Sequence, residues 1–191
     1  MGSNMHFRLM KPKQRAFTLA ELLIVVIILA ILAAIIVPQF SSATVDAQES
    51  ALDANLTGLR SAIELYHAQH GTLYPGAAAT TGGACATKGT GAAGSAQAFM
   101  DSLLMYSDVA GNTCTLGDTT IYRFGPYVRK AIPADPITGK GSVVGEIVVT
   151  NTGAVIAPAA ATGGWAYDTV SGQIVMNSNA VDSRGAVYST H

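Results

Sequence analysis

Residues 17–37 read FTLAELLIVVIILAILAAIIV, and this stretch decides how the chain is organised. It has one charged side chain, Glu21, and one hydroxyl, Thr18. As an α-helix it would span roughly 31 Å, because each helical residue rises about 1.5 Å, and the hydrocarbon core of a bilayer is about 30 Å thick. No other stretch of the chain is as long and as apolar. We therefore predict a membrane-spanning helix here.

A basic segment precedes this helix. Arg8, Lys11, Lys13 and Arg15 lie within it, and it contains no acidic residue. Basic flanks stay on the cytoplasmic side of a membrane. The flank therefore predicts a cytoplasmic N-terminus and an extracytoplasmic remainder.

Three interpretations of the apolar run compete. A secretory signal peptide needs an apolar core of about 7–15 residues and a small-residue cleavage site, and this run is longer. An ordinary signal anchor fits the length and the flank but leaves Glu21 unexplained, although a carboxylate in a membrane costs about 2.5–3.5 kcal/mol on the insertion scale. In the third interpretation, cleavage between Ala16 and Phe17 creates a new α-amine, which Glu21 of a neighbouring subunit neutralises in a helix bundle.

The stretch KQRAFTLAELLIVVIILAILAAIIVPQF, residues 13–40, resembles the class III signal of type IV pilins and of the pseudopilins of type II secretion. The resemblance implies that Ala16 is the last leader residue, although the family usually has Gly there. It implies that Phe17 becomes the methylated N-terminus and that Glu21 is the acid buried on assembly. Pro38 falls where pilins place a helix-kinking proline.

The remainder divides into a stalk and a head. Residues 38–71 have an amphipathic helical pattern, in which Val45, Leu52, Leu59 and Tyr66 recur every seven residues and Gly71 supplies a stop. Residues 72–191 form the extracytoplasmic head, with a Gly/Ala/Thr-rich loop at 76–98. The resemblance implies an α+β fold shaped like a ladle, with the long N-terminal helix packed on an antiparallel sheet.

Within the head the pattern predicts one short helix and several strands. The helix begins near Gln97 and continues to about Tyr106. Residues 121–124 form a short strand, residues 143–150 form a strand with 154–156 as its partner, and residues 165–168 and 173–176 form a hairpin.

The only two cysteines are Cys85 and Cys114, and both fall on the predicted extracytoplasmic side. A disulfide can persist in that environment, and we predict one between them. The alternative is a pair of unpaired, buried thiols.

Three further patterns are considered as binding sites. Residues 89–94 match G-x-G-x-x-G but lack the βαβ context of a dinucleotide site, so we predict a flexible loop. Glu64, His67 and His70 have a conceivable metal-ligand spacing, but polar residues at the end of an amphipathic helix are common. The resemblance to the major pseudopilin points to calcium at three aspartates, Asp118, Asp135 and Asp168. No calcium-loop spacing supports such a site, and we predict neither metal nor cofactor.

Composition excludes several classes of function. The formal net charge is −1 and charged residues make up 12% of the chain, which excludes a basic nucleic-acid-binding protein. Loss of the leader would leave seven basic against twelve acidic residues, so no direct binding to nucleic acid is expected. No local motif of a catalytic triad, a paired carboxylate or a nucleophile elbow is present.

We conclude from the sequence that the chain is a structural filament subunit and not an enzyme. The resemblance implies a homopolymer of a type IV pilus, serving adhesion, motility or DNA uptake. Its partners would be prepilin peptidase, an inner-membrane assembly platform and a cytoplasmic ATPase. The subunit would cross the inner membrane once before assembly and lie outside the cytoplasm or on the cell surface afterwards. Two alternatives stay open, namely a type II secretion pseudopilin and a membrane-anchored periplasmic enzyme or binding domain.

Overall fold

The structure, a computed structural model, describes residues 17–191, apart from the side chains of residues 37, 38 and 41. The leader expected at residues 1–16 lies outside the described residues. The chain divides into two compact units, Met1–Ala43 and Thr44–His191, and the boundary falls within the long helix α1, Leu19–Gln69.

The first unit contains the apolar part of α1. Every residue from 17 to 36 is exposed, and the large aliphatic side chains point in all directions around the helix axis. A helix that is apolar all round needs an apolar environment on every side. The helical backbone continues through position 38, and the kink expected at Pro38 stays a prediction.

In the second unit α1 is amphipathic. Its inward face consists of Leu52, Leu56, Leu59, Ile63 and Tyr66, none more than 1% exposed. Full burial of one such side chain stabilises the fold by about 1.5–3 kcal/mol. The apolar face expected from the seven-residue spacing is therefore confirmed, and the helix ends before Gly71, which has φ +61°, the left-handed conformation of a helix stop.

The short helix α2 is Ala96–Leu104, close to the predicted bounds. Ser95 caps its start, because the Ser95 hydroxyl oxygen accepts a hydrogen bond from the Ala98 N–H at 3.1 Å. The helix stops before the predicted end because Met105 is extended, with φ −112° and ψ 167°. Tyr106 therefore begins a strand instead.

The strands form two small sheets, which with the helices make an α+β fold. In the first sheet, β1 (Tyr106–Ser107) pairs antiparallel with β2 (Thr113–Cys114). In the second, β3 (Ile147–Thr150) pairs parallel with β4 (Trp165–Asp168), which pairs antiparallel with β5 (Ile174–Met176). The predicted hairpin of β4 and β5 is confirmed. Two short 3₁₀ helices complete the unit, η1 (Val144–Glu146) and η2 (Tyr188–Thr190).

Four strand predictions are wrong. The three-stranded sheet is mixed rather than antiparallel, and the strand predicted at 143–150 begins only at Ile147, because residues 144–146 form η1. Residues 154–156 do not pair with β3, and residues 121–124 contribute only an isolated bridge between Phe124 and Ser107. The reason lies at the end of β3, where the N–H groups of Thr152 and Gly153 donate to the Asp168 carboxylate. These two bonds direct the chain away from a tight hairpin after β3. The chain then returns to the sheet as β4, which is parallel to β3.

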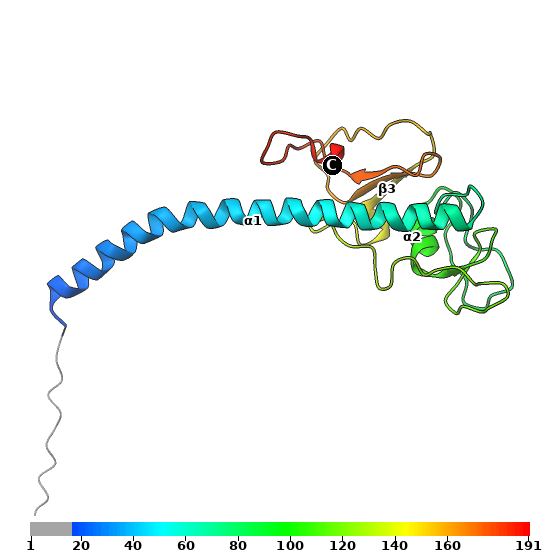
Figure 1. Cartoon of the computed structure of the whole chain (residues 1–191), viewed down its shortest axis with the longest axis horizontal. Helices are drawn as coiled ribbons and strands as arrows, with labels where there is room; N and C mark the ends of the chain where they lie inside the picture. The colour runs from blue at the N-terminus through cyan, green and yellow to red at the C-terminus, as the bar shows by residue number, and fades with distance from the viewer. Residues whose placement is uncertain (1–16) are drawn as a thin grey trace, which may run out of the picture. The chain divides into compact units, whose positions relative to one another are not determined.

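The hydrophobic core lies where the second half of α1 meets the three-stranded sheet and α2. Trp165 and Tyr167 of β4 and Met176 of β5 are fully buried there, together with Phe99 of α2. Figure 1 shows α2 in green and the sheet with β3 beside the cyan part of α1. The amphipathic part of α1 is thus one wall of the core of this unit.

Cys85 and Cys114 form the expected disulfide, which closes a loop between residues 29 positions apart. In the chain-entropy account, such a link stabilises a fold by roughly 3–4 kcal/mol. The bond attaches the Gly-rich loop to β2.

At the end of α1, His70 is buried in an aromatic cluster. Its ring stacks on Tyr66 at 3.8 Å between centroids, Nδ1 bonds to the Tyr66 carbonyl oxygen at 2.8 Å, and Nε2 bonds to the Ser107 hydroxyl at 3.0 Å. Burial lowers the pKa of His70 below its usual value. The folded chain therefore keeps this imidazole neutral.

We predict that the free energy of unfolding decreases as the pH falls below about 6.5, the ordinary histidine pKa. In that range the unfolded chain binds a proton that folded His70 does not, so the loss is at most about 1.4 kcal/mol per pH unit. Urea unfolding of the full chain in detergent, followed by the fluorescence of the single tryptophan, Trp165, measures it. His70→Gln should weaken this pH dependence relative to the unchanged protein, and an identical dependence in both would contradict the prediction.

Candidate functional site

The start of α1 is organised by Thr18 and Glu21. The N–H and the hydroxyl of Thr18 both donate to Glu21 Oε2 at 2.8 Å, and the Glu21 N–H donates to the Thr18 hydroxyl oxygen at 3.2 Å. This reciprocal arrangement is a capping box, in which an N-cap residue and the residue three positions later satisfy free backbone N–H groups. It gives the Glu21 carboxylate a partner within its own chain.

Glu21 is the only ionisable residue of the apolar helix. The window Leu19–Ile36 has a mean hydropathy of 3.2 and is the one helical stretch, among the described residues, that is long and apolar enough to cross a membrane. Because the carboxylate is costly in that environment, such residues mark functional positions. Phe17 lies immediately before the cap and is 85% exposed, while Ala16 lies outside the described residues.

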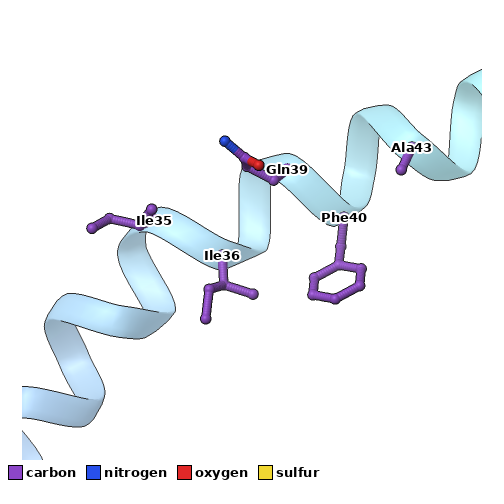
Figure 2. Close-up of a pocket in the computed structure, with 5 residues that line it drawn as sticks. All are labelled: Ile35, Ile36, Gln39, Phe40 and Ala43. Carbon is purple, nitrogen blue, oxygen red and sulfur yellow. The ribbon is translucent and has the colours of Figure 1, made fainter.

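A shallow groove occurs further along α1. It is lined by Ile35, Ile36, Gln39, Phe40 and Ala43, all from this one helix. Figure 2 shows Ile36 and Phe40 projecting to the same side, one helical turn apart. A groove lined by a single exposed helix lacks the enclosing walls of a small-molecule pocket, so we assign it no ligand.

The glycines at 89–94 do not form a phosphate cradle. The N–H groups of Thr90 and Gly91 donate to the Asp101 carboxylate at 2.8 and 3.1 Å, and the Thr80 hydroxyl donates to it at 2.7 Å. Asp101 is a residue of α2 and only 6% exposed. An internal carboxylate therefore occupies the place that an anionic ligand would take, and the segment is held in place rather than free.

The structure does not bring Glu64, His67 and His70 together as ligands. His70 is buried in its own hydrogen bonds, the His67 ring stacks on Tyr74 at 4.0 Å, and Glu64 is exposed. Within residues 17–191, no group of three or more His, Cys, Asp or Glu side chains could hold a metal ion.

The three aspartates considered for calcium lie apart from one another along the chain, Asp118 and Asp135 in loops and Asp168 at the end of β4. Asp118 accepts from the Ile121 N–H, and Asp135 accepts from the N–H groups of Thr138 and Gly164. Asp168 accepts hydrogen bonds from backbone or hydroxyl groups of five residues, Thr150, Thr152, Gly153, Val170 and Ser171. Burial by itself would raise the pKa of Asp168, but hydrogen bonds from Ser171, Thr152 and Thr150 hold it well below its usual range. Each carboxylate thus organises a loop.

The loop-organising role of these acids and the capping role of Thr18 were not predicted from the sequence. The cap had a readable signal, because Thr18-Leu19-Ala20-Glu21 fits the pattern of Ser or Thr followed three residues later by Glu. The bonds of Asp101 to residues 80–91 and of Asp168 to residues 150–153 gave no such signal, since these partners are distant in sequence.

Comparison with known families gives one match. Residues 11–37 match the family model described as a prokaryotic N-terminal methylation motif. This motif is the class III signal sequence of type IV pilins and pseudopilins. The match supports a pilin-like or pseudopilin-like precursor, points to a structural family, and implies processing by prepilin peptidase and filament assembly in general. The apolar helix within the matched residues is consistent with membrane anchoring before assembly. No solved structure matches the chain.

We predict that Thr18→Val loosens the first turn of α1, because it removes the hydroxyl that caps the Glu21 N–H. Loss of an N-cap costs about 0.5–2 kcal/mol, which corresponds to roughly 2- to 30-fold faster amide hydrogen exchange at residues 18–22. Exchange measured on the protein in detergent micelles tests this. Thr18→Ser keeps the hydroxyl and serves as the control, and equal protection in all three proteins would contradict the assignment.

Proposed function

We propose that this protein is the structural subunit of a type IV pilus-like filament. The precursor inserts into the inner membrane with its basic leader on the cytoplasmic side. Prepilin peptidase cleaves between Ala16 and Phe17 and methylates the new amine of Phe17. The matched motif at residues 11–37 supports this order of events, because it includes both the cleavage position and the apolar helix.

The observation that carries the proposal is the single carboxylate at the start of an otherwise apolar, fully exposed helix. In the precursor, the partners of Glu21 are the N–H and hydroxyl of Thr18. Cleavage adds a positive amine one residue before Thr18. In a bundle of such helices, the amine of one subunit and Glu21 of its neighbour attract strongly, because the surroundings have a low dielectric constant.

Polymerisation also accounts for the exposed aliphatic surface. None of the side chains of residues 19–36 is buried in the described chain. Lipid covers such a surface before assembly, and packing against other copies covers it afterwards. Extraction from the membrane requires work, for which an assembly platform and a cytoplasmic ATPase are the expected partners.

A type II secretion pseudopilin is the second candidate. The segment GPYVRKAIPADP, residues 125–136, resembles pseudopilin heads, and it lies along α1 through bonds from Tyr127 to Gln69 and from Asn55 to Ala134. An enzyme that is merely anchored by α1 is less well supported. Leu52, Leu56, Leu59 and Ile63 of α1 belong to the core of the globular unit, so α1 is not a detachable anchor.

Mass spectrometry of the mature N-terminus tests the proposal. Sheared surface filaments should contain a chain that begins at methylated Phe17. The same N-terminus confined to membranes would favour the pseudopilin. An intact leader in both fractions would contradict processing and return the chain to a simple signal anchor.

We predict that Glu21→Ala still inserts and is processed but yields at least tenfold fewer sheared filaments, because the amine of the neighbour loses its partner. Immunoblots of the sheared and membrane fractions measure both quantities. Glu21→Asp keeps the charge and should retain more filaments than Glu21→Ala. A normal filament yield from Glu21→Ala would overturn the role of Glu21 in assembly.

A further inference from the structure

The globular part of α1 has two different flanks beside its buried face. Successive residues of an α-helix are about 100° apart, which places Asp46, Asp53 and Glu64 about 100–120° to one side of buried Leu52. Ala54 and Gly58 lie more than about 100° to the other side. Both flanks belong to the unit Thr44–His191.

The flank that carries Ala54 and Gly58 is bordered by the segment 127–136. The Tyr127 hydroxyl donates to Gln69 Oε1 at 2.7 Å, Asn55 Nδ2 donates to the Ala134 carbonyl oxygen at 3.2 Å, and Gln48 Nε2 donates to the Pro136 carbonyl oxygen at 3.0 Å. These bonds align the segment antiparallel to the helix over about six turns. We call this side the basic flank, because it carries Arg129 and Lys130.

Arg129 and Lys130 are both exposed at this flank, and neither takes part in an ion pair among residues 17–191. The carboxylate of Asp135, in the same segment, is buried and bonded to the N–H groups of Thr138 and Gly164. The two cations therefore face solvent without a compensating acid.

Beside them runs a groove of about 230 Å³ between α1 and this segment. Ala54, Asn55, Gly58 and Leu59 line one wall, and Tyr127, Val128 and Pro133 line the other. A Cβ atom placed on Gly58 would have no neighbour within 4 Å. The small residues leave room for close approach of another chain to the helix backbone.

The flank that carries Asp46, Asp53 and Glu64 is bordered by residues 174–191, and we call it the acidic flank. Ser183 donates to Glu49 through its N–H at 2.7 Å, His191 bonds to Asp53 at 2.8 Å, and Arg60 donates to the Ile174 carbonyl oxygen at 3.2 Å. Asp46 and Glu64 are exposed and form no ion pair within the described residues. Acids outnumber arginines here: Asp46, Glu49, Asp53, Glu64 and Asp182 against Arg60 and Arg184.

We propose that the basic flank binds the acidic flank of a second copy of this chain, with Arg129 and Lys130 facing either Asp46 or Glu64, which lie about 27 Å apart along α1. This inference rests on the proposed filament. Opposite charges on opposite flanks cannot satisfy each other within one copy, but they match between neighbours. Such a contact is heterologous, since different surfaces meet, and it repeats without closing into a dimer. An open helical filament has that symmetry.

The strength expected of each contact is modest. An exposed ion pair changes an equilibrium by about 1.4- to 5-fold. Each copy inside a filament would use both flanks, so the effect recurs at every subunit. Exposed pairs are screened by salt, because the Debye length falls from about 10 Å at 0.1 M to about 3 Å at 1 M. The contact should therefore set the alignment of the globular units, while the apolar helices supply most of the cohesion.

A charge-exchange experiment on the full-length protein tests the contact. One variant combines Arg129→Glu with Lys130→Glu, a second combines Asp46→Lys with Glu64→Lys, and a third carries all four changes. Lys88→Glu, an exposed reversal in the Gly-rich loop, is the control. We expect each double variant to yield at least about fivefold fewer sheared filaments, and we expect the fourfold variant and the control to give yields near that of the unchanged protein. All variants should insert and be processed normally.

Full yield from either double variant would overturn the proposal, and so would failure of the fourfold variant to recover. If the unchanged protein forms no filaments, the proposed function fails, and zero-length carboxyl–amine crosslinking in membranes then decides the contact by itself. Mixed isotope-labelled and unlabelled copies should give a link between Lys130 of one copy and Asp46 or Glu64 of another. Absence of that link in membranes and filaments would overturn the contact.

Discussion

The packing of the inward face of α1 against the sheet and α2 is the contact on which the globular unit depends. Leu52, Leu56, Leu59, Ile63 and Tyr66 fill the centre of the core, and Trp165 and Tyr167 of β4 belong to the same cluster. The second unit has only five strands of two to four residues each, which cannot form a core by themselves. The helix that carries the exposed apolar segment therefore also completes the core of the globular unit.

Because regular strands are few, many loops are held in place by hydrogen bonds to buried carboxylates. Asp101 fixes the Gly-rich segment to α2, Asp168 turns the chain at the end of β3, and Glu49 holds the loop at Ser183 against α1. Each accepts several hydrogen bonds, and a buried charge is tolerated under that condition. Because the oxygens of these carboxylates already accept hydrogen bonds, they are not available as ligands to a metal ion.

The two parts of α1 differ in how their apolar side chains are covered. The second part satisfies its apolar face within the chain, whereas the side chains of residues 19–36 find no cover there. Glu21 stands at the start of the uncovered part, with Thr18 as its partner. An uncovered apolar surface and a costly charge at one end both favour association with further copies, and the oppositely charged flanks of the globular unit would orient that association.

The sequence by itself determined the features that depend on neighbours along the chain. These include the apolar helix with Glu21, the amphipathic pattern of Leu52 and Leu59, the stop at Gly71, the hairpin of β4 and β5 and the pairing of the only two cysteines. Periodicity, turn residues and the lack of other cysteines are local or compositional signals, and they need no knowledge of the folded chain.

Only the tertiary structure decided the parallel pairing of β3 with β4, the burial of His70 and the anchoring of the glycine segment by Asp101. It also placed residues 127–136 along α1. In each case the partners are separated by ten to eighty residues, and the choice among many distant hydrogen-bond acceptors is made by the packing of the core. The sequence contains the residues for these contacts, but their distances in space follow from the whole fold.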